Sequence, residues 1–278
     1  MPAITPRRSW LCLVLAGALL AAAGCAGGPT FPKATLSSSL QALLDREGLD
    51  ASVHVLEHTI ALHVDHSGSM QQTDSSITIG PEFEEVARKA LQTVHRVLLS
   101  TDADIRFYVL LLSDPEVPGA YLTMVRYKDD ILRLNANMLA TDEFFSRTVF
   151  ELRYLDPNLP VNIAQYVKRD IELSDFLSWQ MARRIQAQLT EEFQNDGLAT
   201  VGRCGGEFRN GEFALTLNVS AAEGQPLQEA TVQDVFESAA GVIEDVLSNY
   251  RFEDFESVKL ILPATGRHQI LPKGALRP

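Results

Sequence analysis

The run Asp104-Ile105-Arg106-Phe107-Tyr108-Val109-Leu110-Leu111-Leu112 decides the fold. A second run, Asp254-Phe255-Glu256-Ser257-Val258-Lys259-Leu260-Ile261-Leu262, matches it at an offset of 150 positions. Both runs are rich in the large apolar and β-branched residues that favour strands. A match at such a long period indicates that the chain contains one structural unit twice.

Two earlier segments match in the same way, at an offset of 153. Residues 59–65 and 212–218 both alternate apolar and polar side chains, the period of a half-buried strand. Each follows an expected hairpin partner, and the second pair is joined by Asn210-Gly211, a strong signal for a two-residue hairpin turn. Each unit therefore has a hairpin before its closing strand.

Helices are predicted on both sides of each hairpin. Residues 83–99 and 232–247 carry apolar side chains at intervals of three and four, at an offset of 149. Leading helices are predicted over 36–47 and 176–193. Further strands are expected at 120–127 and 268–271, after the two matching runs.

These elements predict an α+β fold of two related units, 36–155 and 156–278. Each unit has the order helix, hairpin, helix, two strands, and forms a small antiparallel or mixed sheet with helices packed on one face. The other interpretation is two unrelated α+β stretches. Aromatic residues flank the joint, where they either line a groove between the units or pack in the core: Phe144, Phe145, Phe150, Tyr154 and Tyr166.

The N-terminus has the pattern of an export signal. Arg7 and Arg8 precede an uncharged stretch, 10–23, that is shorter than the roughly 20 residues needed to cross a bilayer as a helix. The stretch ends in Ala22-Ala23-Gly24-Cys25, which resembles the lipobox of bacterial lipoproteins. An ordinary secretory signal cut nearby, or an uncleaved anchor, remains the other interpretation.

The lipoprotein resemblance implies a signal peptide over 1–24, a lipid on Cys25 and a lipidated tether over 25–35. Acyl chains on Cys25 would hold the protein at the membrane. Ala26 follows that cysteine, and in this class a residue other than Asp there implies the periplasmic face of the outer membrane. Of the three cysteines, Cys12 leaves with the signal and Cys204 remains as an ordinary small strand residue.

The formal net charge of −12 bears on the partners. An acidic chain lacks the basic face that nucleic acid requires. Removing residues 1–24 takes two arginines and no acidic residue, so −12 becomes −14. An anionic membrane surface repels such a body, so the lipid on Cys25 must make the attachment.

A candidate metal site lies in Asp65-His66-Ser67-Gly68-Ser69. This motif resembles the metal-ion-dependent adhesion site of von Willebrand A domains, in which Asp-x-Ser-x-Ser follows a strand. The resemblance implies Mg²⁺ bound by Asp65, Ser67 and Ser69, with Thr141 and Asp142 offered as later ligands. In that family the helix begins soon after the motif, whereas here residues 71–80 intervene. The other interpretation is a polar loop that turns at Gly68.

Four histidines within thirteen residues make a second metal candidate: His54, His58, His63 and His66. Imidazoles together with Asp65 would suit Zn²⁺. Solvent-facing strand positions are the simpler interpretation of the same residues.

Motifs of common enzyme classes are missing from the sequence, among them Gly-x-Ser-x-Gly, phosphate loops and His-Glu-x-x-His. The stretch 99–108 resembles a group of exported α+β lipoproteins to which no activity is assigned. We therefore expect a non-catalytic binding or assembly module of the cell envelope with a protein partner there. The alternatives are a metal-dependent adhesion-type binder and a hydrolase with scattered catalytic residues.

Overall fold

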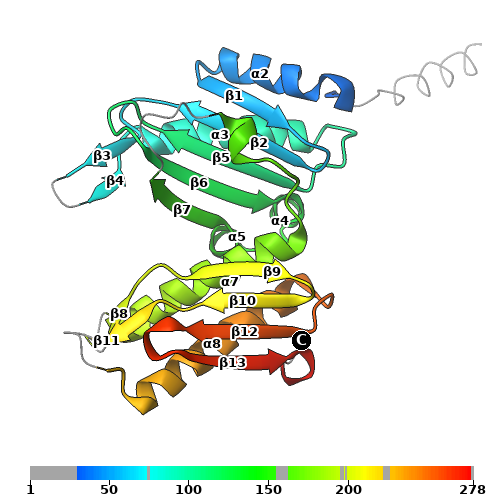
Figure 1. Cartoon of the computed structure of the whole chain (residues 1–278). Helices are drawn as coiled ribbons and strands as arrows, with labels where there is room; N and C mark the ends of the chain where they lie inside the picture. Colours follow the sequence, from blue (N-terminus) through cyan, green and yellow to red (C-terminus); the bar gives the residue numbers. More distant parts are fainter. Residues whose placement is uncertain are drawn as a thin grey trace, which may run out of the picture.

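The computed structural model describes residues 30–73, 76–154, 162–194, 197, 199–221 and 226–276 (Figure 1). The predicted signal over 1–24 and the predicted lipid site Cys25 lie outside the described residues. Within the described ranges, no helix combines the length and apolar character needed to cross a membrane.

The first sheet has five strands in the order β1-β2-β5-β6-β7. Its strands are β1 (Asp50–Val55), β2 (Thr59–Asp65), β5 (Phe107–Ser113), β6 (Ala120–Tyr127) and β7 (Val149–Tyr154). β1 and β2 form an antiparallel hairpin, β2 and β5 pair in parallel, and β6 and β7 continue the sheet antiparallel. The parallel pair is connected by helix α3 (Phe83–Leu98), so the centre of the sheet is a β-α-β unit.

The second sheet has four strands in the order β13-β12-β10-β9. Its strands are β9 (Gly205–Arg209), β10 (Glu212–Thr216), β12 (Ser257–Leu262) and β13 (Arg267–Pro272). β9 and β10 form the predicted hairpin, whose turn residues Asn210 and Gly211 have φ angles of 51° and 79°. Helix α8 (Glu229–Tyr250) connects β10 to β12, which again pair in parallel.

Both halves therefore follow the order helix, hairpin, helix, two strands, and the α+β class is confirmed. The leading helices are α2 (Leu36–Arg46) and α7 (Leu173–Leu189). Each sheet is mixed, with a parallel pair at its centre and an antiparallel strand on either side. That the two halves arose as copies of one sequence stays a prediction.

Two further strand pairs lie outside these sheets. The strand pair of β3 (Met70–Gln72) and β4 (Ile77–Ile79) lies between the Asp65 motif and α3. β8 (Ala199–Val201) pairs with β11 (Val219–Ala221) beside the second sheet.

Helices α2 and α3 cover one face of the first sheet. The stripe predicted for α3 is buried there, and alternate residues of β2 and β5 face it. The residues buried in this layer include Leu40, Leu44, Ile60, Leu62, Val64, Val86, Ala90, Val94, Val97, Tyr108, Leu110 and Leu112.

The helices of the first unit lie on one face of its sheet, and the opposite face is also covered, by α7 of the second unit. Phe107, Val109 and Leu111 of β5 belong to a core that includes Phe176 and Leu177 of α7 and extends into the second sheet. The physical reason is the unbroken apolar run of β5, because a strand buried on both faces has no polar side to present to water. Helix α7 therefore lies between the two sheets (Figure 1).

Elements that the sequence did not predict surround the joint. Helices α4 (Lys128–Asn135) and α5 (Thr141–Ser146) precede β7, and the short helix α6 (Ile163–Tyr166) precedes α7. Part of the predicted tether also packs on the fold. Phe31 is buried and its N–H donates to the carbonyl of Ser100 at 3.2 Å.

Candidate functional site

A cleft of about 550 Å³ lies between the two units. The second face of β6 and β7 forms one wall, α7 and the start of β9 form another, and the segment from Tyr166 to Ile171 closes a third side. Its volume is in the range of small-molecule sites in proteins. The packing of α7 against both sheets creates this cleft, so it exists only when the two units are together.

Three guanidinium groups converge on the single carboxylate of Glu151 in this cleft. Glu151, on β7, is 7% exposed. Arg153 reaches Glu151 Oε2 with both Nε and Nη2 at 2.6 Å, and Arg183 of α7 reaches Oε1 at 3.2 Å. Arg203, just before β9, forms a third ion pair with Oε1. These residues come from both units, so Glu151 joins the units as well as lining the cleft.

This cluster has more positive than negative charge. Three guanidinium groups share one carboxylate, and in the described part of the chain no other acidic side chain pairs with Arg153 or Arg203. Burial lowers the pKa of Arg183; Glu151 opposes this effect, and the charge of Arg203 adds to it. An excess of about two positive charges therefore lies at the cleft, in a chain whose net charge is −12.

The remaining lining of the cleft combines aromatic and aliphatic surfaces. The Arg153 guanidinium lies 5.8 Å from the centre of the Tyr166 ring, and the Tyr166 hydroxyl is 2.8 Å from Thr123 Oγ1. Trp179 of α7 is half-buried and lines the same space. The first sheet contributes an apolar floor of Val109, Val125 and Val149.

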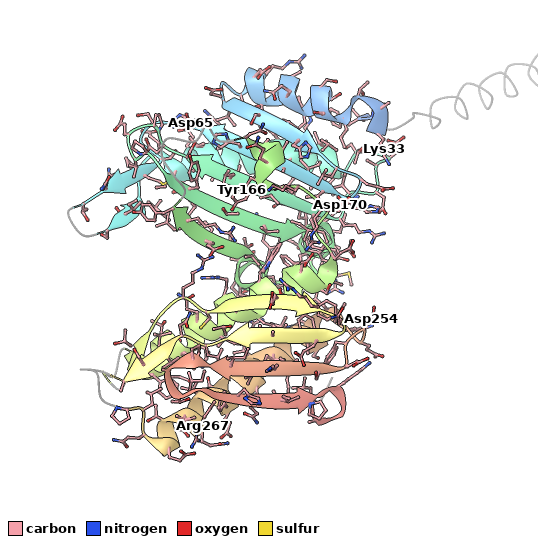
Figure 2. The ribbon with its side chains drawn as sticks, viewed as in Figure 1. Lys33, Asp65, Tyr166, Asp170, Asp254 and Arg267 are labelled. Atoms are coloured by element: carbon pink, nitrogen blue, oxygen red, sulfur yellow. The ribbon has the colours of Figure 1, made fainter. Side chains whose placement is uncertain are left out.

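The rim of the cleft carries further cations. Arg169 is 68% exposed and forms two hydrogen bonds with the Asp175 carboxylate, at 2.6 and 2.9 Å. Asp170 accepts a hydrogen bond from the backbone N–H of His58 at 2.8 Å, which fixes this rim to the start of β2 (Figure 2). Lys168 adds an exposed ammonium. The lining thus holds five basic residues, Arg153, Lys168, Arg169, Arg183 and Arg203, against three acidic ones, Glu151, Asp170 and Asp175.

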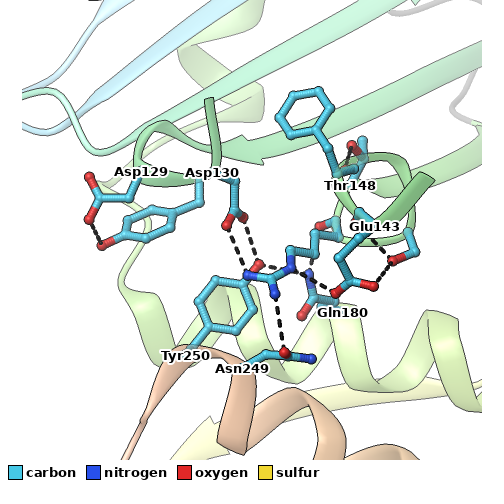
Figure 3. A network of polar contacts seen from close by, with 11 residues as sticks. Asp129, Asp130, Glu143, Thr148, Gln180, Asn249 and Tyr250 are labelled. Atoms are coloured by element: carbon cyan, nitrogen blue, oxygen red, sulfur yellow. Dashed lines mark hydrogen bonds and ion pairs between the residues drawn. The ribbon is translucent and has the colours of Figure 1, made fainter. Parts of the chain in front are cut away.

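A buried polar network joins the units next to the cleft (Figure 3). Arg147, at the end of α5, is 6% exposed and contacts Glu143 at 2.8 Å and Asp130 at 3.2 Å. Its third partner is Asn249 Oδ1 of α8 at 3.1 Å. Tyr250, the last residue of α8, donates to Asp130 Oδ2 at 2.7 Å.

Gln180 of α7 completes this network. Its Nε2 donates to the carbonyl of Arg147 at 2.6 Å and to the Tyr250 hydroxyl at 3.1 Å. Burial raises the pKa of Asp130, although Tyr250 and Arg147 pull it down, and burial and Asp130 together raise the pKa of Tyr250. Asp130 and Arg147 of the first unit each have a partner on α8, so the network fixes the relative position of the units.

The predicted metal residues lie at the carboxyl end of β2, where the parallel strand β5 also ends. Asp65 Oδ1 accepts a hydrogen bond from Ser113 Oγ at 2.7 Å, and Ser113 Oγ is 2.8 Å from His63 Nε2. The Ser67 hydroxyl donates to Glu116. Two of the three predicted ligands therefore have protein partners.

Ser69 is the exception among the three. It is fully buried, and among the described residues its hydroxyl has no hydrogen-bond partner. The loop is tightly built, because a Cβ at Gly80 would lie 2.2 Å from the carbonyl oxygen of Gly68. Gly68 itself has a φ of 81°, as the turn interpretation predicts. An oxygen-rich loop with one unpartnered hydroxyl suits a hard cation in its chemistry.

The other predicted ligands do not gather at this loop. Thr141 and Asp142 begin α5, which follows the end of β6 at the opposite end of the sheet. His58 contacts Asp104 at 3.3 Å before β2 begins, away from His63. In the described residues, no group of three or more His, Cys, Asp or Glu side chains could hold a metal ion.

Two other expectations concern Cys204 and the aromatic residues at the joint. Cys204 is buried, and burial raises the pKa of its thiol, in keeping with an ordinary packing residue. Of the five aromatic residues, Tyr166 lines the cleft and Phe144 is in the core. Phe150 and Tyr154 are 38% and 66% exposed and belong to the opposite face of β7 from Glu151.

The sequence did not identify the arginine cluster, because its members come from three separate segments of the chain. The one available signal was Arg153 two residues after Glu151, an alternation that places both on one face of a strand. No protein-family model matches the chain, and the search of curated proteins found no match.

Proposed function

We propose that the chain is a lipid-anchored, non-catalytic binding module of the cell envelope whose ligand occupies the cleft between the units. The observation that carries this proposal is the convergence of Arg153, Arg183 and Arg203 on the one carboxylate of Glu151. Charged groups this concentrated beside a small-molecule-sized cavity are typical of binding sites.

A non-catalytic role is favoured by the chemistry of the cleft lining. Arginine remains protonated at physiological pH, so it binds and orients anions but does not exchange protons. Glu151 is engaged by three guanidinium groups and so serves to hold them together. These groups support recognition of a ligand.

Binding can be tested with Trp179, because Trp10 is the only other tryptophan. In the full chain carrying Trp10→Phe, Trp179 reports on the cleft alone. A small-molecule extract of the cell envelope should change its emission, and Arg203→Met should remove the response. Arg209→Met is the matched control, since Arg209 is exposed and pairs with Glu207, and neither residue lines the cleft. If no fraction of the extract changes the emission of Trp179, that result counts against a ligand in the cleft.

Anchoring is tested separately, through the predicted lipid site. Cys25→Ser should move the chain from the membrane to the soluble fraction of the cell envelope, and metabolic labelling with palmitate should be lost. The control variant Cys204→Ser should keep the membrane location and the palmitate label. If the Cys25→Ser protein stays with membranes and keeps its label, the anchor is not on Cys25.

A metal-dependent adhesion-type binder is the second candidate function, and the unpartnered hydroxyl of Ser69 favours it. Asp65, Ser67 and Ser69 would hold Mg²⁺ and leave a coordination position for an acidic group of a partner. Calorimetry of the full chain with Mg²⁺ should give binding heat that Asp65→Ala removes. Asp254→Ala, at an exposed acid of the second unit, should leave that heat unchanged. Equal heats in both variants would exclude this candidate.

A further inference from the structure

The cleft lining also defines the chemical class of its ligand, an inference that rests on the proposed binding function. Two features of the lining bear on it: the charge left over at Glu151 and the apolar surface beside it. Within this lining, Arg183 and Tyr166 are held by hydrogen bonds to other elements.

The leftover charge requires an anion. Arg153 and Arg203 are 39% and 59% exposed, so both reach solvent in the cleft while Arg183, at 22%, stays beneath them. Each guanidinium has five N–H donors, and Glu151 takes up only part of those of Arg153 and Arg203. Among the described residues, the other donors of Arg153 and Arg203 have no acidic partner, and guanidinium donors bind carboxylate or phosphate through two parallel hydrogen bonds.

The position of Arg183 keeps Glu151 in place when an anion arrives. Arg183 also donates to the carbonyl of Cys204 at 2.9 Å and to Gln186 Oε1 at 2.9 Å, so its guanidinium is fixed. An anion can therefore take donors from Arg153 and Arg203 while Glu151 keeps Arg183. The site neutralises its excess charge without leaving Glu151 unpaired.

The apolar part of the lining requires an apolar body on the same ligand. Trp179 is half-buried beside Val125 and Val149, and the Tyr166 ring lies under Arg153. A bare inorganic anion would leave this surface in water, whereas a ring or branched chain would remove it from water and bind more tightly for that reason.

We propose that the cleft binds a small organic anion, with a carboxylate or phosphate group held by Arg153 and Arg203 and an apolar body packed against Trp179. The cavity of about 550 Å³ limits the ligand to a small molecule. Because the local excess is about two charges, a phosphate monoester neutralises the cluster more fully than a monocarboxylate does.

Phenyl phosphate, phenylacetate, benzyl alcohol and inorganic phosphate test the two parts of this proposal. They are titrated into the full chain carrying Trp10→Phe, and Trp179 emission is recorded with excitation at wavelengths where the probes do not absorb. Phenyl phosphate should bind most tightly and phenylacetate next. Benzyl alcohol and inorganic phosphate should each bind at least about tenfold more weakly than phenyl phosphate.

Variants locate the binding. Arg203→Met should weaken phenyl phosphate at least about tenfold, Arg203→Lys by less, and Arg209→Met not at all. Arg203 is 59% exposed, so thermal unfolding should show that these variants remain folded. Arg153→Met removes the other guanidinium that holds the anion, and it should weaken the binding of phenyl phosphate in the same way.

The outcomes separate this inference from the proposed function. Benzyl alcohol binding as tightly as phenyl phosphate, or full binding by Arg203→Met, overturns the anionic class. Inorganic phosphate binding as tightly as phenyl phosphate overturns the apolar body. In each case the response to the envelope extract still measures whether the cleft holds a ligand. If the extract also fails to change Trp179 emission in the Trp10→Phe chain, the proposed function itself is overturned.

Discussion

Arg147 lies with its guanidinium carbon 5.1 Å from the centre of the Tyr250 ring, which joins the end of α5 to the last residue of α8. Arg147 is 6% exposed, and its charge is balanced by Asp130 and Glu143 within the first unit. The contact therefore brings a buried, fully paired cation from one unit against an aromatic ring from the other.

Arg147→Met should lower the free energy of unfolding by about 3–5 kcal/mol, because it leaves the buried carboxylate of Asp130 without its cation. Urea denaturation followed by circular dichroism measures the loss. Arg209→Met is the control, since an exposed pair contributes at most about 1 kcal/mol. Similar losses in the two variants would contradict the role given to the network.

A neighbouring pair of glycines gives a second prediction. A Cβ on Gly206 would lie 2.1 Å from the carbonyl oxygen of Ser178, so Gly206→Ala must move β9 away from α7. We expect the free energy of unfolding to fall by about 1–3 kcal/mol, the usual range for overpacking. Gly205→Ala is the matched control, because a Cβ there meets no atom within 4 Å. Comparable thermal unfolding of the two variants would refute this packing.

Glu151→Gln should destabilise the fold by about 1–3 kcal/mol, since three guanidinium groups then repel one another without a carboxylate between them. Sulfate should restore stability in this variant by binding in place of the lost carboxylate. Sulfate also stabilises folded proteins generally, so Glu207→Gln, at an exposed acid, measures that general effect. Equal sulfate responses in both variants would argue against an anion site at the cluster.

His95 gives a prediction about pH. Burial, with a contribution from Arg126, lowers its pKa to about 4, and its Nε2 is 2.8 Å from the Tyr108 hydroxyl. Below its ordinary pKa of 6.5, the unfolded chain takes up a proton that the folded chain refuses. The contribution of His95 to stability is therefore present above about pH 6.5 and is lost as the pH falls towards 4.

Between pH 7 and pH 5, the His95 contribution should fall by about 2 kcal/mol. His95→Gln should remove this part of the pH dependence, although it changes the contact with Tyr108. Urea denaturation gives the free energy of unfolding at pH 7 and at pH 5. The difference between these two values is compared between His95→Gln and the unchanged chain. An unchanged slope in His95→Gln would mean that other groups set the acid sensitivity.

Much of the fold follows from local patterns. The period of the apolar residues in α3 and α8, and the turn at Asn210 and Gly211, depend on neighbours within a few positions of the chain, so the sequence alone predicts them. The strands at the joint were missed. In β7, Phe150 and Leu152 face one side while Glu151 and Arg153 face the other. The apolar side is the more exposed one and Glu151 is buried, the reverse of the pattern that predicts a buried face.

The arrangement of the joint could not be predicted, for a different reason. The contact of α7 with the first sheet depends on residues such as Val109 and Leu177, which are far apart in the chain and resemble any other core positions. Glu151 and Arg203 likewise lie in separate segments, and neither carries a local motif. The Asp65 motif did lie at the end of a central strand, but the partner chosen by Ser67 was a glutamate from the loop after β5.

The place of α7 between the sheets also determines the order in which the layers of the molecule can form. The strands of the first sheet end at Tyr154, but the cover of Phe107, Val109 and Leu111 comes from α7, which ends at Leu189. Until α7 packs, this apolar strip of β5 faces water on one side. A fragment that stops before α7 should therefore associate with itself or with a chaperone through that strip.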